Sequence, residues 1–317
     1  MRDFEYFTNH ALGMEYNTQY PISNLQYPPM FQRLQSSFHF RNVRHENDTA
    51  ILDVSDLTVR YNGVAALDSV SFQLRIGERV AVVGPNGAGK STLFKVVAGV
   101  LPATHGEVKV FGHGPEGHIC IAYVPQRSQV DWRFPVNVAD VVMMGRIGKI
   151  GLFRWPQKRD WDVVRESLDL VGMTHLAKRQ IGELSGGQQQ RVFIAQALAQ
   201  KADLILMDEP LNGLDAPSQE AIFDLLDELK RRHVTVMVAT HDLHIAAERF
   251  DRVMLLNRKL LGFGLPFEII APERLVEAYG GQMQVIATPD GKQVMIEECC
   301  HDGAEPERAI DGLGTAS

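Results

Sequence analysis

Cysteines, long apolar runs and an excess of positive charge are missing or scarce in this sequence. Only three cysteines occur among 317 residues, too few for a disulfide framework and typical of a reducing compartment. No run of about 18 apolar residues is present, so we expect no segment to span a bilayer by itself. The formal net charge of −7 argues against a nucleic-acid partner, which usually requires a basic face. We therefore expect a cytoplasmic protein.

The chain divides by composition into three parts. Residues 1–50 show neither helical nor alternating apolar periodicity, and we interpret them as a flexible N-terminal extension. Residues 51–285 alternate short apolar runs with helical segments and form the main domain, with a helical subdomain at about 128–195. Residues 286–317 are expected to form a short hairpin and a disordered tail.

The main domain has the pattern of an α/β protein. Strands are expected at 51–60, 69–76, 79–83, 204–207 and 234–238, and helices at about 90–99, 185–200 and 217–231. Strands that alternate with helices predict a mostly parallel sheet covered by helices on both faces.

A phosphate-binding loop follows the apolar run at 79–83. The segment 84–91 matches the pattern G-x-x-x-x-G-K-[ST] and consists of Gly84, Pro85, Asn86, Gly87, Ala88, Gly89, Lys90 and Ser91, with Thr92 next. Glycines let backbone N–H groups approach phosphate oxygens, and the following helix directs its positive dipole end at the same anion. Lys90 is expected to contact the β- and γ-phosphates of ATP, and the Ser91 hydroxyl to bind Mg²⁺.

Polar residues also end two further apolar strands. Asp208 and Glu209 follow the run 204–207, and His241 follows the run 234–238. In open α/β sheets ligands bind at the carboxyl ends of the strands, so these side chains should meet Lys90 at one rim. We expect Asp208 to hold Mg²⁺, Glu209 to polarise the attacking water, and His241 to fix the γ-phosphate and water relative to Glu209.

A second glycine-rich segment, at the expected start of a helix, indicates the family that this chain resembles. Leu184, Ser185, Gly186, Gly187 and Gln188 read LSGGQ, and Ser185 lies 95 residues after Lys90 and 23 before Asp208. LSGGQ at this place is the signature of ABC ATPases. The resemblance covers about 51–285 and implies their P-loop NTPase fold, with an antiparallel β subdomain and an inserted helical subdomain beside the core sheet.

The resemblance also implies roles for individual residues. Tyr61 matches the aromatic residue that stacks on adenine, and Gln126 matches the glutamine that senses Mg²⁺ and the γ-phosphate. Asp215 matches the aspartate of the D-loop, where Asn212 and Gly213 replace the Ser-Ala of many relatives. Ser185, Gly186, Gly187 and Gln188 would complete the ATP site of a second, head-to-tail copy, so a homodimer is implied.

Three segments are similar to the manganese, zinc and iron group of ABC importers, and most similar to its manganese-type members. These segments are 126–138, 140–146 and 272–281. The similarity implies an ATP-hydrolysing subunit that drives divalent metal uptake, with manganese favoured, through a separate permease. An extracytoplasmic substrate-binding protein would act indirectly, and the chain would lie peripherally on the inner face of the cell membrane.

Two alternatives remain open at this point. The cargo could be a siderophore or cobalamin, whose importers carry a similar Val-x-Gly-Arg stretch, or the chain could be an ATP-gated regulatory dimer without transport. A basic segment (Arg146, Lys149, Arg154, Lys158 and Arg159) fits either a solvated helical face or a surface near anionic lipid heads.

Overall fold

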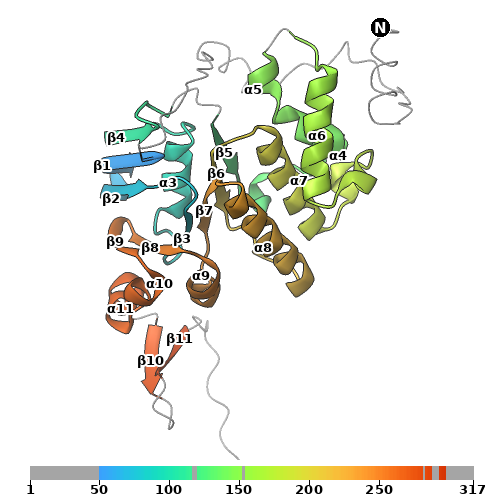
Figure 1. The fold of residues 1–317 in the computed structure, drawn as a ribbon. Helices are drawn as coiled ribbons and strands as arrows, with labels where there is room; N and C mark the ends of the chain where they lie inside the picture. Colours follow the sequence, from blue (N-terminus) through green and yellow to red (C-terminus); the bar gives the residue numbers. More distant parts are fainter. Residues whose placement is uncertain (1–49, 116–119, 152–153, 281–282, 288–292, 298–317) are drawn as a thin grey trace, which may run out of the picture.

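A six-stranded sheet forms the centre of the molecule (Figure 1). The computed structural model describes residues 50–115, 120–151, 154–280, 283–287 and 293–297. The strand order is β5-β6-β7-β3-β8-β9, with β3 at Arg79–Val83, β5 at Ile121–Val124, β6 at Leu204–Asp208, β7 at Thr235–Ala239, β8 at Arg252–Asn257 and β9 at Lys259–Gly264. All neighbours pair in parallel except β8 and β9.

The central strands are continuous apolar runs because helices cover both faces of the sheet. Every residue of β6 and β7 is buried, as expected for strands inside a parallel sheet. The helices α3 (Lys90–Val97), α8 (Ala216–Arg231) and α9 (Leu243–Arg249) follow β3, β6 and β7, respectively. The predicted α/β class with a mostly parallel sheet is confirmed.

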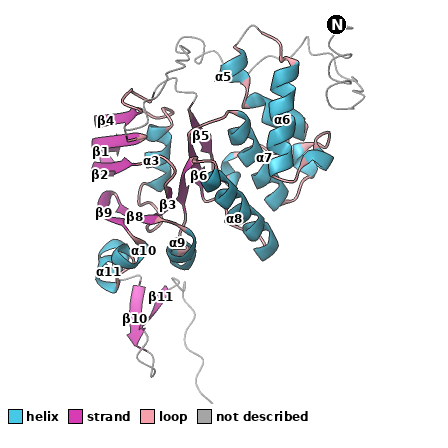
Figure 2. Ribbon diagram, in the orientation of Figure 1, coloured by secondary structure: helices cyan, strands magenta, loops and turns pink. Residues whose placement is uncertain are grey.

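A separate antiparallel sheet of three strands packs against α3 (Figure 2). Its order is β2-β1-β4, with β1 at Leu52–Tyr61, β2 at Val64–Leu74 and β4 at His105–Val110. The second strand was predicted to begin at 69 but begins at Val64, because Asn62 (φ 48°) and Gly63 (φ 83°) alone form the hairpin turn. Side chains of this sheet, of α3 and of β3 share one buried apolar cluster.

The helical part contains α4 (Val138–Met144), α5 (Ile147–Ile150), α6 (Lys158–Leu170) and α7 (Gly186–Ala199), shown in green and yellow in Figure 1. A short 3₁₀ turn at Arg127–Gln129 precedes α4, and two more, at Thr174–Leu176 and Ile181–Glu183, lie between α6 and α7. Arg146 belongs neither to a solvated face nor to a lipid-facing surface, because it is buried in an ion pair with Asp160.

The last described elements are α10 (Pro266–Ile269), α11 (Pro272–Tyr279), β10 (Met283–Ala287) and β11 (Gln293–Glu297). β10 and β11 pair antiparallel, and the predicted hairpin turn between them lies outside the described residues, as do residues 1–49 and 298–317. Within the described ranges, no helix combines the length and apolar character needed to cross a membrane.

Candidate nucleotide-binding site

The phosphate loop joins β3 to α3 and is shaped by two close backbone approaches. A Cβ atom on Gly84 would lie 1.9 Å from the Leu256 carbonyl oxygen, and one on Gly89 would lie 2.5 Å from the Ala66 carbonyl oxygen. Gly89 also has φ 97°, a conformation that L side chains rarely adopt. The Arg258 N–H donates to the Ala88 carbonyl over 2.8 Å and fixes the loop to the turn between β8 and β9. The loop is therefore held in place by its neighbours.

Lys90 is the first residue of α3 and is buried. Its Nζ donates to the Gly84 carbonyl over 2.6 Å and to the Pro85 carbonyl over 3.1 Å. Burial lowers the pKa of Lys90, whereas the nearby Glu209 and Asp208 carboxylates raise it. An ammonium group held by two loop carbonyls in a partly dehydrated site is suited to bind a phosphate anion.

The ends of several strands open onto one cavity of about 840 Å³. Its lining includes the loop from Gly84 to Thr92, together with Gln126, Glu209 and His241. These residues follow β3, β5, β6 and β7, four neighbouring strands of the parallel part of the sheet. The predicted convergence of these strand ends is thus present in the fold.

Asp208 ends β6 and is buried beside the loop. Burial raises its pKa, and hydrogen bonds with Ser91 and Tyr123 act in the opposite direction. The Tyr123 hydroxyl on β5 donates to Asp208 Oδ2 over 3.3 Å. Two oxygen-bearing side chains, Ser91 and Asp208, therefore meet at the start of α3, and such hard oxygen ligands suit Mg²⁺.

Glu209 has an unusual backbone conformation with φ 49°. Its N–H donates to the Ala239 carbonyl at the end of β7 over 3.1 Å, which holds the backbone in this strained region. Gln126 Nε2 donates to Glu209 Oε2 over 2.8 Å, and Asn212 Nδ2 donates to the same oxygen over 3.2 Å. The carboxylate is thus oriented by two amides.

The signature segment begins α7 through a capping box. The Ser185 hydroxyl accepts from the Gln188 N–H over 3.4 Å, and Gln188 Oε1 accepts from the Ser185 N–H over 3.0 Å. A Cβ on Gly186 would lie 2.4 Å from Arg127 Nη1, and one on Gly187 would lie 2.4 Å from Ser218 Oγ. Gly187 is therefore also required by packing against α8, whereas a side chain at Gly186 would displace only the flexible end of Arg127.

Comparisons with known proteins identify the family. A family model described as ABC transporter matches residues 67–212. The manganese transport system ATP-binding protein MntB of Bacillus subtilis is 44% identical over 233 residues, which cover 73% of this chain and 93% of that protein. The chain belongs to the ABC transporter family. The resemblance seen in the sequence is confirmed.

Further comparisons agree on the family and the fold. The zinc transport system ATP-binding protein TroB of Treponema pallidum is 47% identical to this ABC protein, covering 78% of this chain and 93% of TroB. A solved structure of a metal-chelate type ABC transporter in an inward-facing conformation matches with a TM-score of 0.67 and 29% identity. That match covers 80% of this chain and 99% of the other.

The cavity of this ABC protein does not contain every residue predicted for its site. Tyr61, at the end of β1, does not contribute to the described lining, and neither does the signature segment from Ser185 to Gln188. Asp215 instead caps α8, where its carboxylate accepts from the Ser218 N–H over 3.0 Å. The roles of these residues in ATP binding remain predictions.

The cavity also includes residues that the sequence did not assign to it. Ala66, Asn212 and Tyr279 line it, and Tyr123 contacts Asp208 beside it. Asn212 stands out in the sequence as a departure in the D-loop, whereas Tyr279 lies on α11, 189 residues after Lys90, with no local pattern to connect them. Within the described part of the chain, no group of three or more His, Cys, Asp or Glu residues is arranged as a metal site.

Proposed function

We propose that this chain is the ATP-hydrolysing subunit of an importer for a divalent metal ion, with manganese as the favoured cargo. The observation that carries the proposal is the cavity that brings the phosphate loop, Gln126, Glu209 and His241 together. Relatives that align along nearly their whole length are manganese and zinc transport system ATP-binding proteins, which supports the choice of cargo.

Each part of the cavity has a distinct role in this proposal. The loop N–H groups and Lys90 bind the phosphates, and Glu209 accepts a proton from the attacking water. His241 orients the γ-phosphate and the water. Mg²⁺, held by Ser91, Asp208 and Gln126, would neutralise charge on the phosphate oxygens. Hydrolysis then depends mainly on positioning and electrostatics.

Two copies of the chain would act together in a head-to-tail dimer. The signature segment from Ser185 to Gln188 and Asp215 of one copy would complete the ATP site of the other. Their absence from the lining of the described cavity supports this arrangement. Loss of the γ-phosphate on hydrolysis would loosen the dimer.

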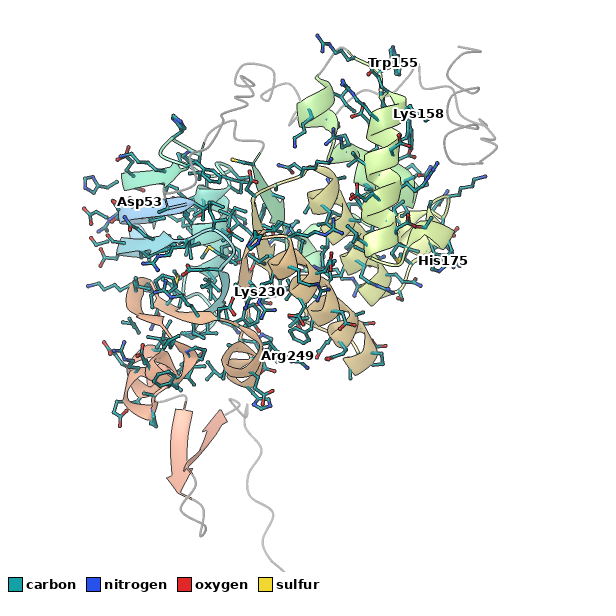
Figure 3. All side chains as sticks on the ribbon, viewed as in Figure 1. Asp53, Trp155, Lys158, His175, Lys230 and Arg249 are labelled. Atoms are coloured by element: carbon teal, nitrogen blue, oxygen red, sulfur yellow. The ribbon has the colours of Figure 1, made fainter. Side chains whose placement is uncertain are left out.

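A separate permease would dock onto the helical part of the chain, peripheral to the inner face of the membrane. Exposed apolar side chains occur there, at Phe134, Ile147 and Trp155, and Trp155 is 75% exposed. Figure 3 shows Trp155 at the top of the view, beyond the start of α6. Solvent-exposed apolar groups of this size are suited to a protein partner.

Radiotracer uptake tests the function and the cargo together. Cells that make the chain with its permease would be offered Mn²⁺, Zn²⁺ or Fe²⁺, and the wild type would be compared with Glu209→Gln. We expect manganese to accumulate with the wild type and not with Glu209→Gln. Accumulation of zinc or iron alone would correct the cargo.

Uptake of none of the three ions, together with ATP hydrolysis by the purified chain, would contradict metal import and favour a siderophore or cobalamin cargo. Co-purification with a soluble partner, and with no membrane protein, would favour the regulatory dimer.

A further inference from the structure

The Glu209 carboxylate is anchored through one of its two oxygens. Oε2 accepts from Gln126 Nε2 over 2.8 Å and from Asn212 Nδ2 over 3.2 Å. Amide N–H groups orient a carboxylate without exchanging a proton with it. Among the described residues, no side chain donates to Oε1. The arrangement fixes one oxygen and leaves the other for a water molecule.

Asn212 reaches Glu209 because a tight turn folds the chain back. The Asn212 N–H donates to the Glu209 carbonyl over 3.3 Å, and Pro210 lies between them at the position where its fixed φ suits a turn. From α8, Gln219 Nε2 donates to the Leu211 carbonyl inside the turn over 3.5 Å and to the Leu214 carbonyl just after it over 3.2 Å. The backbone of the turn is thus held independently of the Asn212 side chain, which is free to act on the carboxylate.

We propose that Asn212 is a positioning residue for ATP hydrolysis, holding Glu209 Oε2 so that Oε1 receives the proton of the attacking water. The inference rests on the proposed role of Glu209. It gives a function to the position where the D-loop departs from the Ser-Ala of many relatives. It also adds a residue to the site that no sequence motif assigned.

The contribution of Asn212 is largest when nucleotide is bound. Gln126 is the proposed contact of Mg²⁺ and the γ-phosphate, so it can leave Glu209 when they bind. Asn212 then remains as the side-chain donor to Oε2. An aspartate at position 212 would have the same shape but would place a second negative charge about 3 Å from the first.

Steady-state ATP hydrolysis by the purified full-length chain tests this role. We expect Asn212→Ala to lower kcat roughly 10- to 150-fold, the range for a lost hydrogen bond to a charged group. The KM for ATP should stay within about twofold, because Asn212 acts on the water-activating group and not on ground-state binding. Asn212→Asp should lower kcat at least as much.

Gln219→Ala is the matched control, because it loosens the same turn without removing a donor to Glu209. We expect it to keep kcat near the wild-type value. Asn212 is exposed, so its variants should melt at the wild-type temperature.

Three results would overturn the inference: a kcat for Asn212→Ala at or above the wild-type value, wild-type kcat for Asn212→Asp, or an equal loss in Gln219→Ala. Glu209→Gln, measured in the same assay, distinguishes a failure of the proposed Asn212 role from a failure of the proposed Glu209 role. If Glu209→Gln abolishes turnover and Asn212→Ala does not reduce it, only the role of Asn212 fails. If Glu209→Gln hydrolyses ATP at the wild-type rate, the proposed role of Glu209 fails first.

Discussion

Asp208 shows at the scale of one residue how a functional group can oppose folding. Its side chain is buried at the end of β6. This burial, together with the nearby Glu209 carboxylate, raises its pKa above the ordinary value, although hydrogen bonds with Ser91 and Tyr123 act in the opposite direction. The folded chain therefore binds a proton on Asp208 more readily than the unfolded chain does. Its ionised form destabilises the fold at neutral pH, and a bound cation would offset this effect.

Asp208→Asn should therefore raise the Tm of the nucleotide-free chain at pH 7. The gain should shrink as the pH falls toward 3.8, the ordinary pKa of an aspartate, because protonated Asp208 carries no such penalty. The same variant should lose the Tm increase that MgATP gives the wild type. Thermal melts between pH 4 and 7, with and without MgATP, measure both effects. A lower Tm at pH 7 with a preserved response to MgATP would contradict this account.

Residues of the site differ in how far the sequence alone reveals them. Lys90 follows a fixed loop pattern, and Glu209 follows a continuous apolar strand, so both are predictable from local sequence. The contact of Tyr123 with Asp208 depends on β5 lying beside β6 in parallel register. The paired residues Ala122 and Ile205 are 83 residues apart in the sequence. No local pattern encodes such a pairing.

Among the elements, α4, α6 and α7 are joined by a buried ion pair. Arg146, just after α4, donates from Nη2 to Asp160 Oδ1 over 3.1 Å and from Nη1 to the Ala199 carbonyl over 2.9 Å. Asp160 Oδ2 also accepts from the Gln157 N–H over 3.0 Å at the start of α6. Gly145 completes the junction, because a Cβ there would lie 2.2 Å from the Gln196 carbonyl oxygen. The Gly-Arg pair therefore holds three helices together.

Arg146→Ala should lower the free energy of unfolding by about 3–5 kcal/mol, the range for a buried charge left without its partner. Urea unfolding followed by circular dichroism measures the change. Arg159→Ala is the matched control, because Arg159 is exposed and adjacent to Asp160 in the sequence, and it should change stability by less than about 0.5 kcal/mol. Equal losses in the two variants would refute the structural role of the buried pair.

The elements themselves were more predictable than their packing. Apolar runs located β3, β6 and β7, because strands inside a parallel sheet must be apolar on both faces. The burial of Arg146 was not predictable, because charged residues in a helical segment usually face solvent and its partner Asp160 lies 14 residues away on another helix.

At the scale of the whole molecule, one copy of the chain provides only part of the proposed site. The phosphate loop, Gln126, Glu209 and His241 share one cavity, whereas the signature segment starts α7 outside its lining. In the proposed cycle ATP therefore joins two copies, and Glu209 releases them by activating water. The family and the fold were predictable from the sequence. The contacts between two copies were not, because they depend on a whole surface and a local motif covers only a few residues of it.

The most direct test is the mass of Glu209→Gln in MgATP, measured by light scattering on a size-exclusion column beside the wild type. Without hydrolysis the γ-phosphate stays in place, so we expect Glu209→Gln to elute as a stable dimer in MgATP and as a monomer without nucleotide. A monomer in MgATP that also hydrolyses ATP at the wild-type rate would contradict the account.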